Sequence, residues 1–209
     1  MCRSVKRLVV GLGNPGADYV WTPHNLGFHV VEKLCADAHL IFEPSAVLGL
    51  SALTAPCRVA RHTKCDALLV EPLTYMNGSG LVVATLSRAL GVPSEDILVV
   101  YDDLDLQLGA LRIRPHGGTG GHRGVQSIVE RLGTDRFPRL RVGIGRPRTD
   151  AARHVLTPMA GDERVIAEIA VSNAAVAIAS WLSEGSIERC MTRFHSRWKQ
   201  GPEQAEPTA

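Results

Sequence analysis

The sequence lacks the cysteine spacing of a disulfide framework or a zinc site. Its five cysteines are odd in number and widely separated along 209 residues, and none belongs to a Cys-x-x-Cys pair. Disulfide-rich domains and structural zinc sites both need closer, paired cysteines. We therefore expect most of the cysteines to be small apolar residues that fill space in the core. A catalytic cysteine is disfavoured, because a reactive thiol needs an activating base nearby.

The sequence also lacks a long hydrophobic run. No apolar stretch approaches the roughly 20 residues needed to cross a bilayer. The basic start Met1–Arg7 leads into a short strand-like run without the apolar core of a signal peptide. With 45% hydrophobic and 21% charged residues, the composition is that of an ordinary globular protein. We expect one cytoplasmic domain over residues 1–198, a polar disordered tail at 199–209, and no membrane partner.

The small net charge of +2 conceals an uneven distribution of charge along the chain. Between Arg112 and Arg153 the sequence has ten arginines and three acidic residues. This polarity indicates a basic face that can neutralise the phosphates of a nucleic acid. A solvated arginine-rich surface with no such partner explains the same composition equally well.

Alternating strand and helix patterns predict the fold class. The predicted strands are Arg7–Gly11, one or two short ones within 46–60, Asp66–Glu71, Ile97–Tyr101, Ala110–Arg114 and Arg139–Ile144, the last with its arginines pointing outward. The predicted helices are Pro23–Asp37, Ser79–Leu90 ended by Gly91, Val125–Leu132 ended by Gly133, one capped by Asp162 and running to Ser183, and one capped by Ser186. These patterns predict an α/β single-domain three-layer sandwich, in which a mixed, mostly parallel sheet has helices on both faces.

A glycine-rich turn after the first predicted strand matches the dinucleotide-binding pattern G-x-G-x-x-G. In that motif the helix begins at once, so that its N-terminus contacts the pyrophosphate. Here the turn Gly11–Gly16 is followed by a loop, and the helix is delayed to about residue 23. The acidic residue expected on a second strand is also missing, so we expect no nucleotide cofactor. The glycines more plausibly allow a tight turn that brings Asn14 to the carboxyl edge of the sheet, where open α/β proteins bind their ligands.

Candidate acid–base residues are predicted at the same edge of the sheet. His24 falls in the first turn of a predicted helix, whose positive end favours the uncharged imidazole that a general base needs. Asp102 is one of three acidic residues after the strand that ends at Tyr101, and its carboxylate can accept the second imidazole N–H and fix the tautomer. An acidic turn and a cation site are the alternatives for these acids, although their spacing makes a poor calcium loop.

Two further segments are suited to binding an anion or a developing oxyanion. Asn77 precedes a predicted helix, either as a plain N-cap or as an amide donor to an oxyanion. The glycine-rich loop Gly117–Gly124 enters another helix, but it lacks the Gly-Lys-Ser/Thr ending of a nucleotide P-loop. The sequence has no metal-ligand constellation and no Gly-x-Ser-x-Gly nucleophile elbow. The residues alone therefore indicate a hydrolytic site beside an arginine-rich face.

These segments together resemble the bacterial-type peptidyl-tRNA hydrolase family. The matching motifs occur in the right order and spacing over roughly residues 7–195. They are Val10–Gly16 with Tyr19, His24-Asn25-x-Gly27, Pro72–Gly80, Tyr101–Leu106, Gly117–Gly124 and Arg139–Pro147. The resemblance implies a monomeric, metal-free esterase that cleaves the bond between a peptide, or an N-blocked amino acid, and the 3′ ribose of tRNA.

The resemblance also implies a role for each residue of the catalytic site. His24 is the base that activates water, and Asp102 is its orienting partner. Asn14 forms hydrogen bonds near the histidine and the peptide end, while Asn77 holds the peptide carbonyl and helps to bind the oxyanion. Because the ester has a good leaving group, water and a base suffice without a covalent nucleophile.

Further residues are implied in substrate binding. Tyr19 lies by the 3′ adenosine, and Tyr75 also belongs to the substrate-binding set. Arg112 and Arg114 match positions at which the family uses basic residues to clamp the 5′ phosphate of the tRNA. Phosphate contacts of this kind position a nucleic acid without reading its sequence.

Two positions depart from the family pattern. Pro23 stands where the family usually has an arginine before the catalytic histidine. Arg123 stands where the family commonly has an asparagine that is thought to hold the catalytic water or the substrate end. An arginine at that position can instead grip the terminal phosphates or the ribose. Both departures also suit a non-catalytic RNA-binding protein on the same fold, which is the alternative to an enzyme.

Overall fold

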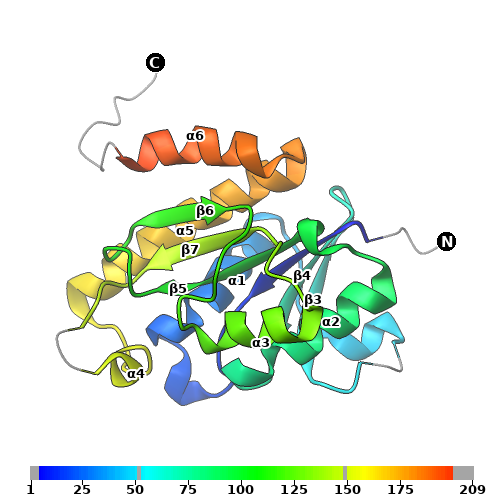
Figure 1. The fold of residues 1–209 in the computed structure, drawn as a ribbon, viewed down its shortest axis with the longest axis horizontal. Coiled ribbons are helices and arrows are strands. Elements are labelled where there is room, and N and C mark those ends of the chain that lie inside the picture. Colours follow the sequence, from blue (N-terminus) through cyan, green and yellow to red (C-terminus); the bar gives the residue numbers. More distant parts are fainter. Residues whose placement is uncertain (1–4, 51–52, 148–149, 200–209) are drawn as a thin grey trace.

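Within the described residues, seven strands form one mixed sheet with helices on both faces (Figure 1). The structure is a computed structural model that describes residues 5–50, 53–147 and 150–199. The strands are β1 Arg7–Gly11, β2 Glu43–Pro44, β3 Cys57–His62, β4 Ala67–Pro72, β5 Ile97–Asp103, β6 Leu111–Arg114 and β7 Arg139–Gly143. Their order is β2-β3-β4-β1-β5-β7-β6, with parallel pairing from β4 to β7 and antiparallel pairing at both edges. The predicted α/β sandwich is confirmed.

Two hydrophobic cores lie on opposite faces of this sheet. Helices α1 Leu26–Asp37 and α5 Gly161–Glu184 cover one face, and α2 Ser79–Leu90 and α3 Arg123–Leu132 cover the other. Because successive strand residues point to opposite faces, β1 places Val9 in the first core and its two neighbours in the second. Strands buried on both faces read as continuous apolar runs, as the central strands do here.

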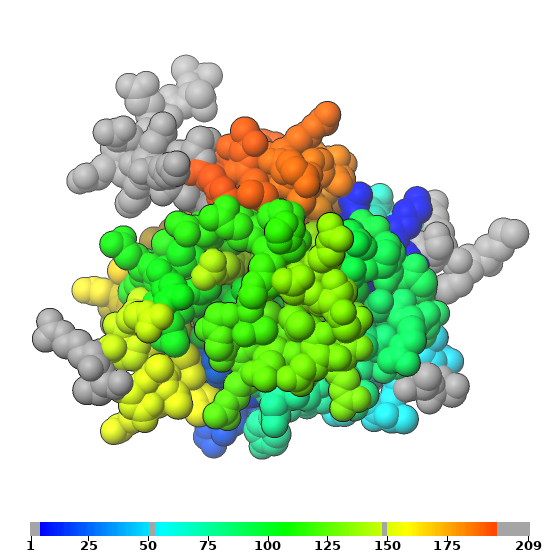
Figure 2. Space-filling model, viewed as in Figure 1, coloured from blue at the N-terminus to red at the C-terminus, as the bar shows by residue number. Residues whose placement is uncertain are grey.

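The last helix, α6 Ile187–Lys199, packs along the edge strand β6 (Figure 2). A hydrogen bond of 2.9 Å from the backbone N–H of Ile113 to Nε2 of His195 joins the two elements. As predicted, Ser186 caps this helix by accepting the N–H of Arg189. The helix ends at residue 199, and the rest of the predicted tail lies outside the described residues.

Helix ends marked by glycine were predicted best. Helix α2 has the predicted bounds, and Gly91 follows it with a φ of 67°, a left-handed conformation that glycine adopts without a steric penalty. Asp162 was predicted as an N-cap, and this is wrong. Helix α5 begins at Gly161, so Asp162 lies inside its first turn; Ala160 is at the cap position, without a side-chain cap bond.

Other boundaries also differ from the predictions. Within residues 46–60 the chain forms a 3₁₀ turn, Ser45–Leu48, and only the strand that begins at Cys57; residues 51–52 lie outside the described part. Strand β5 continues two residues past Tyr101, so Asp102 is its penultimate residue rather than part of a following turn. The short helix α4, Ala151–His154, was not predicted.

The expectation that the arginines of β7 alternate outward is wrong for Arg139. Its side chain is almost fully buried, and the guanidinium carbon lies 4.3 Å from the ring centroid of Phe137. Its Nη1 donates to the carbonyl of Gly118 at 2.8 Å, and its Nη2 donates to the carbonyl of Asp135 at 2.9 Å. These bonds make burial of the charge tolerable. They also tie the glycine-rich loop to the sheet.

Helix α5 is an exception to the expectation that no apolar stretch of the chain approaches the length needed to cross a bilayer. It is the one helix in the described ranges that is long and apolar enough to cross a membrane, with a mean hydropathy of 1.7 over its most apolar window. More than half of that window is buried inside the protein. A core helix passes the same test of length and composition, so the finding is weak evidence for a membrane span.

Three of the four described cysteines are buried core residues, and Cys65 is partly buried. Cys35, Cys57, Cys65 and Cys190 are all free thiols. Burial raises the pKa of Cys190 to about 11, so its thiol stays protonated at neutral pH. Burial also raises the pKa of Cys35 and of Cys57.

Candidate functional site

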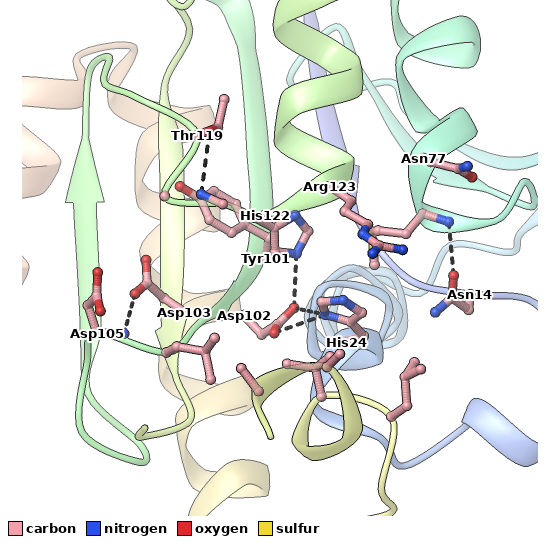
Figure 3. A pocket seen from close by; sticks show the side chains of 18 of the residues that line it. Asn14, His24, Asn77, Tyr101, Asp102, Asp103, Asp105, Thr119, His122 and Arg123 are labelled. Atoms are coloured by element: carbon pink, nitrogen blue, oxygen red, sulfur yellow. Dashed lines mark hydrogen bonds and ion pairs between the residues drawn. The ribbon is translucent and has the colours of Figure 1, made fainter. Parts of the chain in front are cut away.

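The carboxyl ends of the central parallel strands bring the predicted side chains to one cavity of about 510 Å³ (Figure 3). Its lining includes seven of the nine predicted site residues, namely Asn14, Tyr19, His24, Tyr75, Asn77, Asp102 and Arg123. The loop after β1 supplies the first three of these, β5 supplies Asp102, and α3 begins with Arg123. The rule that ligands bind at the carboxyl edge of such sheets therefore located the cavity correctly.

His24 and Asp102 form a hydrogen-bonded pair at the centre of this cavity. The imidazole Nδ1 lies 2.9 Å from Oδ1 and 3.0 Å from Oδ2 of Asp102. A carboxylate accepts the Nδ1 proton, so Nε2 is the ring nitrogen that carries a lone pair. The imidazole is slightly exposed, while the carboxylate is buried behind it. The pair therefore offers a basic nitrogen toward the cavity.

The local backbone holds His24 differently from the prediction. Residues Pro23–Asn25 form a 3₁₀ turn, and α1 begins only at Leu26. Thr22 occupies the cap position of this turn but makes no side-chain cap bond, and its hydroxyl donates to the carbonyl of Tyr19 at 2.9 Å. The backbone N–H of His24 donates to the carbonyl of Val155 at 3.1 Å. The contact with Asp102, rather than the end of the helix, therefore fixes the imidazole.

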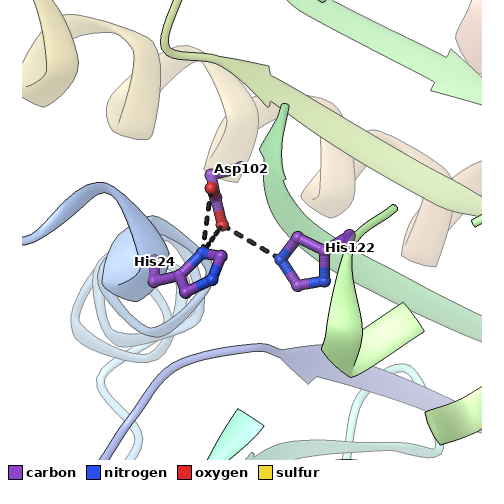
Figure 4. A group of neighbouring side chains, drawn as sticks. All are labelled: His24, Asp102 and His122. Carbon is purple, nitrogen blue, oxygen red and sulfur yellow. Dashed lines mark hydrogen bonds and ion pairs between the residues drawn. The ribbon is translucent and has the colours of Figure 1, made fainter. Parts of the chain in front are cut away.

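His122, which was not among the predicted site residues, is the second imidazole on the same carboxylate (Figure 4). Its Nε2 lies 3.1 Å from Oδ1 of Asp102, and its Nδ1 accepts the N–H of Val125 at 3.3 Å as the N-cap of α3. Because Nδ1 is an acceptor, Nε2 carries the proton and donates it to Asp102. The sequence feature that could have indicated His122 is its place at the junction between the glycine-rich loop and a predicted helix.

The two imidazoles control the charge of Asp102. Burial alone would raise the pKa of this carboxyl, but the nearby imidazoles of His24 and His122 outweigh burial and hold the pKa below its usual range. Asp102 is therefore ionised at neutral pH. An ionised carboxylate behind a base can stabilise the imidazolium that forms when the base takes a proton.

The amide of Asn14 is held in one orientation. Its Oδ1 accepts the backbone N–H of Met76 at 2.9 Å, so its Nδ2 is left as a donor on the cavity side. Its backbone N–H donates to the Asn25 side chain at 2.8 Å, and its carbonyl accepts from that side chain at 3.0 Å. Asn14 is thus a fixed hydrogen-bond donor near His24.

Close packing explains the glycines of the first turn. A Cβ on Gly11 would lie 2.3 Å from the carbonyl oxygen of Gly27, and a Cβ on Gly27 would lie 2.4 Å from the backbone nitrogen of Leu12. These glycines let α1 approach β1 closely. They therefore set the position of the turn that carries His24.

The remaining predicted residues line the rim of the cavity. Asn77 lies in the 3₁₀ turn Met76–Gly78 and is exposed; because Gly78 is the N-cap of α2, the plain N-cap interpretation of Asn77 is wrong. Tyr75 is exposed and Tyr19 is half-buried. All three are accessible to a ligand in the cavity.

Arg112 and Arg114 do not line the cavity. They lie on the edge strand β6 with exposed side chains, opposite Arg141 and Arg139 of β7. They therefore form a basic surface beside the cavity rather than a part of it.

The three acidic residues after Tyr101 are Asp102, Asp103 and Asp105, for which an acidic turn and a cation site were the alternatives. Asp103 forms an ion pair with Arg141, and Asp105 forms one with Arg146. In the described residues, the group that could hold a metal is His24, Asp102 and His122, whose ligand atoms lie within 4.8 Å of one another. Hydrogen bonds among these three side chains account for their spacing, and metal-free chemistry stays a prediction.

Comparisons with known proteins cover almost the whole chain. A family model described as peptidyl-tRNA hydrolase matches residues 8–203. A peptidyl-tRNA hydrolase of Desulforudis audaxviator is 42% identical over 193 residues, which are 92% of this chain and 94% of the relative. One of Aquifex aeolicus is 45% identical over 168 residues, 78% of this chain and 83% of the relative. The crystal structure of peptidyl-tRNA hydrolase from Acinetobacter baumannii superposes with a TM-score of 0.80 at 32% identity, covering 92% of this chain and 95% of that one.

Proposed function

The chain belongs to the peptidyl-tRNA hydrolase family, and we propose that its hydrogen-bonded His24–Asp102 pair performs the hydrolysis. The protein is a hydrolase of the ester between a peptide, or an N-blocked amino acid, and the 3′ ribose of tRNA. The observation that supports the assignment to these residues is that His24, Asp102, Asn14 and Asn77 line one cavity. Apart from the departures at Pro23 and Arg123, no observation on the described residues favours a non-catalytic RNA-binding protein.

The proposed reaction is a direct attack of water on the acyl carbon. Nε2 of His24 takes a proton from a water molecule whose oxygen bonds to the acyl carbon, and the carbonyl oxygen becomes an oxyanion. Nδ2 of Asn14 and the amide of Asn77 are the proposed donors to the peptide carbonyl and the oxyanion. The C–O bond to the ribose then breaks, and the imidazolium returns its proton to the ribose oxygen. The products are the peptide acid and tRNA with a free 3′ hydroxyl.

The carboxylate behind the base has two proposed tasks. Asp102 keeps the Nδ1 proton of His24 in place, so that Nε2 faces the water. It also stabilises the transient imidazolium. His122 acts as a positioning residue, because its hydrogen bond to Oδ1 leaves Asp102 little freedom to rotate away from His24.

The proposed contacts with tRNA lie at and beside the rim of the cavity. Tyr19 would meet the 3′ adenosine, and Tyr75 would contact the end of the substrate. Arg112 and Arg114, on β6, would clamp the 5′ phosphate. We further propose that the protein acts in the cytoplasm as a monomer and needs no metal ion.

The release of N-acetylated amino acid from tRNA tests this function. Purified protein should convert N-acetylaminoacyl-tRNA to N-acetylamino acid and deacylated tRNA, with a chelator present to remove transition metals. A protein that binds the tRNA and leaves the ester intact would support the non-catalytic alternative instead.

Charge reversal on β6 tests the phosphate clamp. The double variant Arg112→Glu, Arg114→Glu should bind tRNA more weakly. Its plot of log affinity against log salt should be flatter by roughly 0.7–0.9 for each phosphate that the protein no longer neutralises, because fewer counterions are released. Arg88 is an exposed arginine on α2, and Arg88→Glu is the control that shows the effect of one charge reversal outside β6. A salt dependence equal to that of the wild type would refute the clamp.

A further inference from the structure

Each carboxylate that lines the cavity is held by a hydrogen bond or an ion pair with neighbouring groups. Two imidazoles contact Asp102, and arginines pair with the other two, as Arg141 does with Asp103 and Arg146 with Asp105. An anion that enters the cavity therefore meets no unpaired carboxylate among the described lining residues.

Arg123 is the arginine of the cavity lining whose guanidinium does not pair with a carboxylate of the described residues. It is exposed, and the structure gives it no hydrogen bond or ion pair with the described residues. Arg146, the other arginine of the lining, is occupied by Asp105. The cavity consequently has a guanidinium that is available to a ligand.

The backbone of Arg123 is anchored next to the reacting groups. It begins α3 directly after His122, whose Nε2 is 3.1 Å from Asp102. Figure 3 shows its side chain extending from α3 into the cavity, on the side where His24 and Asn14 lie. The guanidinium thus faces the acyl end of the substrate rather than the basic strand β6.

Hydrolysis changes the charge of the acyl group of the substrate, which Arg123 faces. The ester is neutral, whereas the released peptide acid loses its proton at neutral pH and becomes a carboxylate. A guanidinium binds a carboxylate through two parallel hydrogen bonds, and it binds a neutral ester carbonyl more weakly. Nδ2 of Asn14 adds a neutral donor to the same cavity.

We propose that Arg123 forms a carboxylate subsite that retains the released peptide. This inference rests on the proposed function, since the carboxylate is that of the reaction product. The ligand class is an N-acylated amino acid or short peptide with a free C-terminal carboxylate. Such acids should inhibit the enzyme competitively, and the corresponding amides should inhibit it much less.

Direct binding to the full chain, without tRNA, tests the subsite. N-acetyl-dialanine and its C-terminal amide would be titrated into the protein by NMR. We expect the wild type to bind the acid about five- to tenfold more tightly than the amide, in the range of a partly exposed charge-assisted hydrogen bond. Arg123→Gln should bind the two ligands equally, within about twofold, and Arg123→Lys should keep part of the preference.

Arg131→Gln is the matched control, because Arg131 is exposed on the same helix and does not line the cavity. It should keep the wild-type preference for the acid. Equal affinities of the wild type for acid and amide, or an unchanged preference in Arg123→Gln, would overturn the subsite. A loss of deacylated-tRNA binding in Arg123→Gln, with the acid preference intact, would overturn it too and assign Arg123 to phosphate or ribose.

The outcome is separable from that of the proposed function. If the wild type cleaves N-acetylaminoacyl-tRNA and shows no preference for the acid, only the subsite fails. If it prefers the acid and leaves the tRNA ester intact, the carboxylate-binding site stands, but the hydrolytic assignment fails and with it the role of the site in retaining a product.

Discussion

Replacing His24 by alanine should lower the turnover number by at least about 100-fold, because a positioned general base typically contributes 10²–10⁴-fold to a rate. Affinity for tRNA should change little, since the imidazole is mostly enclosed by Asp102 and its neighbours and lies away from β6. Steady-state deacylation of N-acetylaminoacyl-tRNA gives the turnover number, and equilibrium binding of deacylated tRNA gives the affinity.

The matched control for this variant is His39→Asn. His39 is an exposed histidine beyond α1 with a φ of 54°, a conformation that asparagine tolerates. It should have wild-type turnover. Turnover of His24→Ala close to that of the wild type would remove His24 from the mechanism, and a parallel loss of tRNA binding would make it a binding residue.

Replacing Asp102 by asparagine should have the second largest effect, a loss of turnover of about 10²–10⁴-fold. The amide keeps the shape of the side chain, but it has one acceptor oxygen for two imidazole N–H groups and no charge to stabilise the imidazolium. KM should change less than kcat, because the carboxylate is buried behind the imidazole and away from the substrate.

Asp105→Asn is the control for Asp102→Asn. It removes the same charge from another carboxylate of the cavity lining, one that pairs with Arg146 and contacts neither imidazole. Its kcat should stay within a few-fold of the wild-type value. Equal losses in the two variants would mean that Asp102 contributes only to the general field of the cavity.

The elements that the sequence predicted well are those with local causes. Helix α2 ends at Gly91 because a single residue supplies the left-handed conformation, and β1 is an apolar run closed by a glycine. The carboxyl-edge rule then grouped His24 with Asp102, although 78 positions separate them in the chain.

The features that the sequence did not predict depend on three-dimensional neighbours. Strand alternation places Arg139 on a face of the sheet, but only the approach of the glycine-rich loop makes that face buried. His122 contacts Asp102 because α3 begins next to the end of β5, a distance that no local pattern encodes. The 3₁₀ turn at Pro23–Asn25 differs from a first α-helical turn only in that its hydrogen bonds join residues three rather than four apart. Residue preferences do not distinguish these two turns.

Single-turnover deacylation of N-acetylaminoacyl-tRNA tests most directly whether His24 is the base, because it measures the chemical step apart from product release. After correction for uncatalysed hydrolysis, the His24→Ala rate constant should be at least about 100-fold below that of the wild type, since the variant has no imidazole to accept a proton from water. A single-turnover rate constant in the variant near that of the wild type would contradict the proposed mechanism.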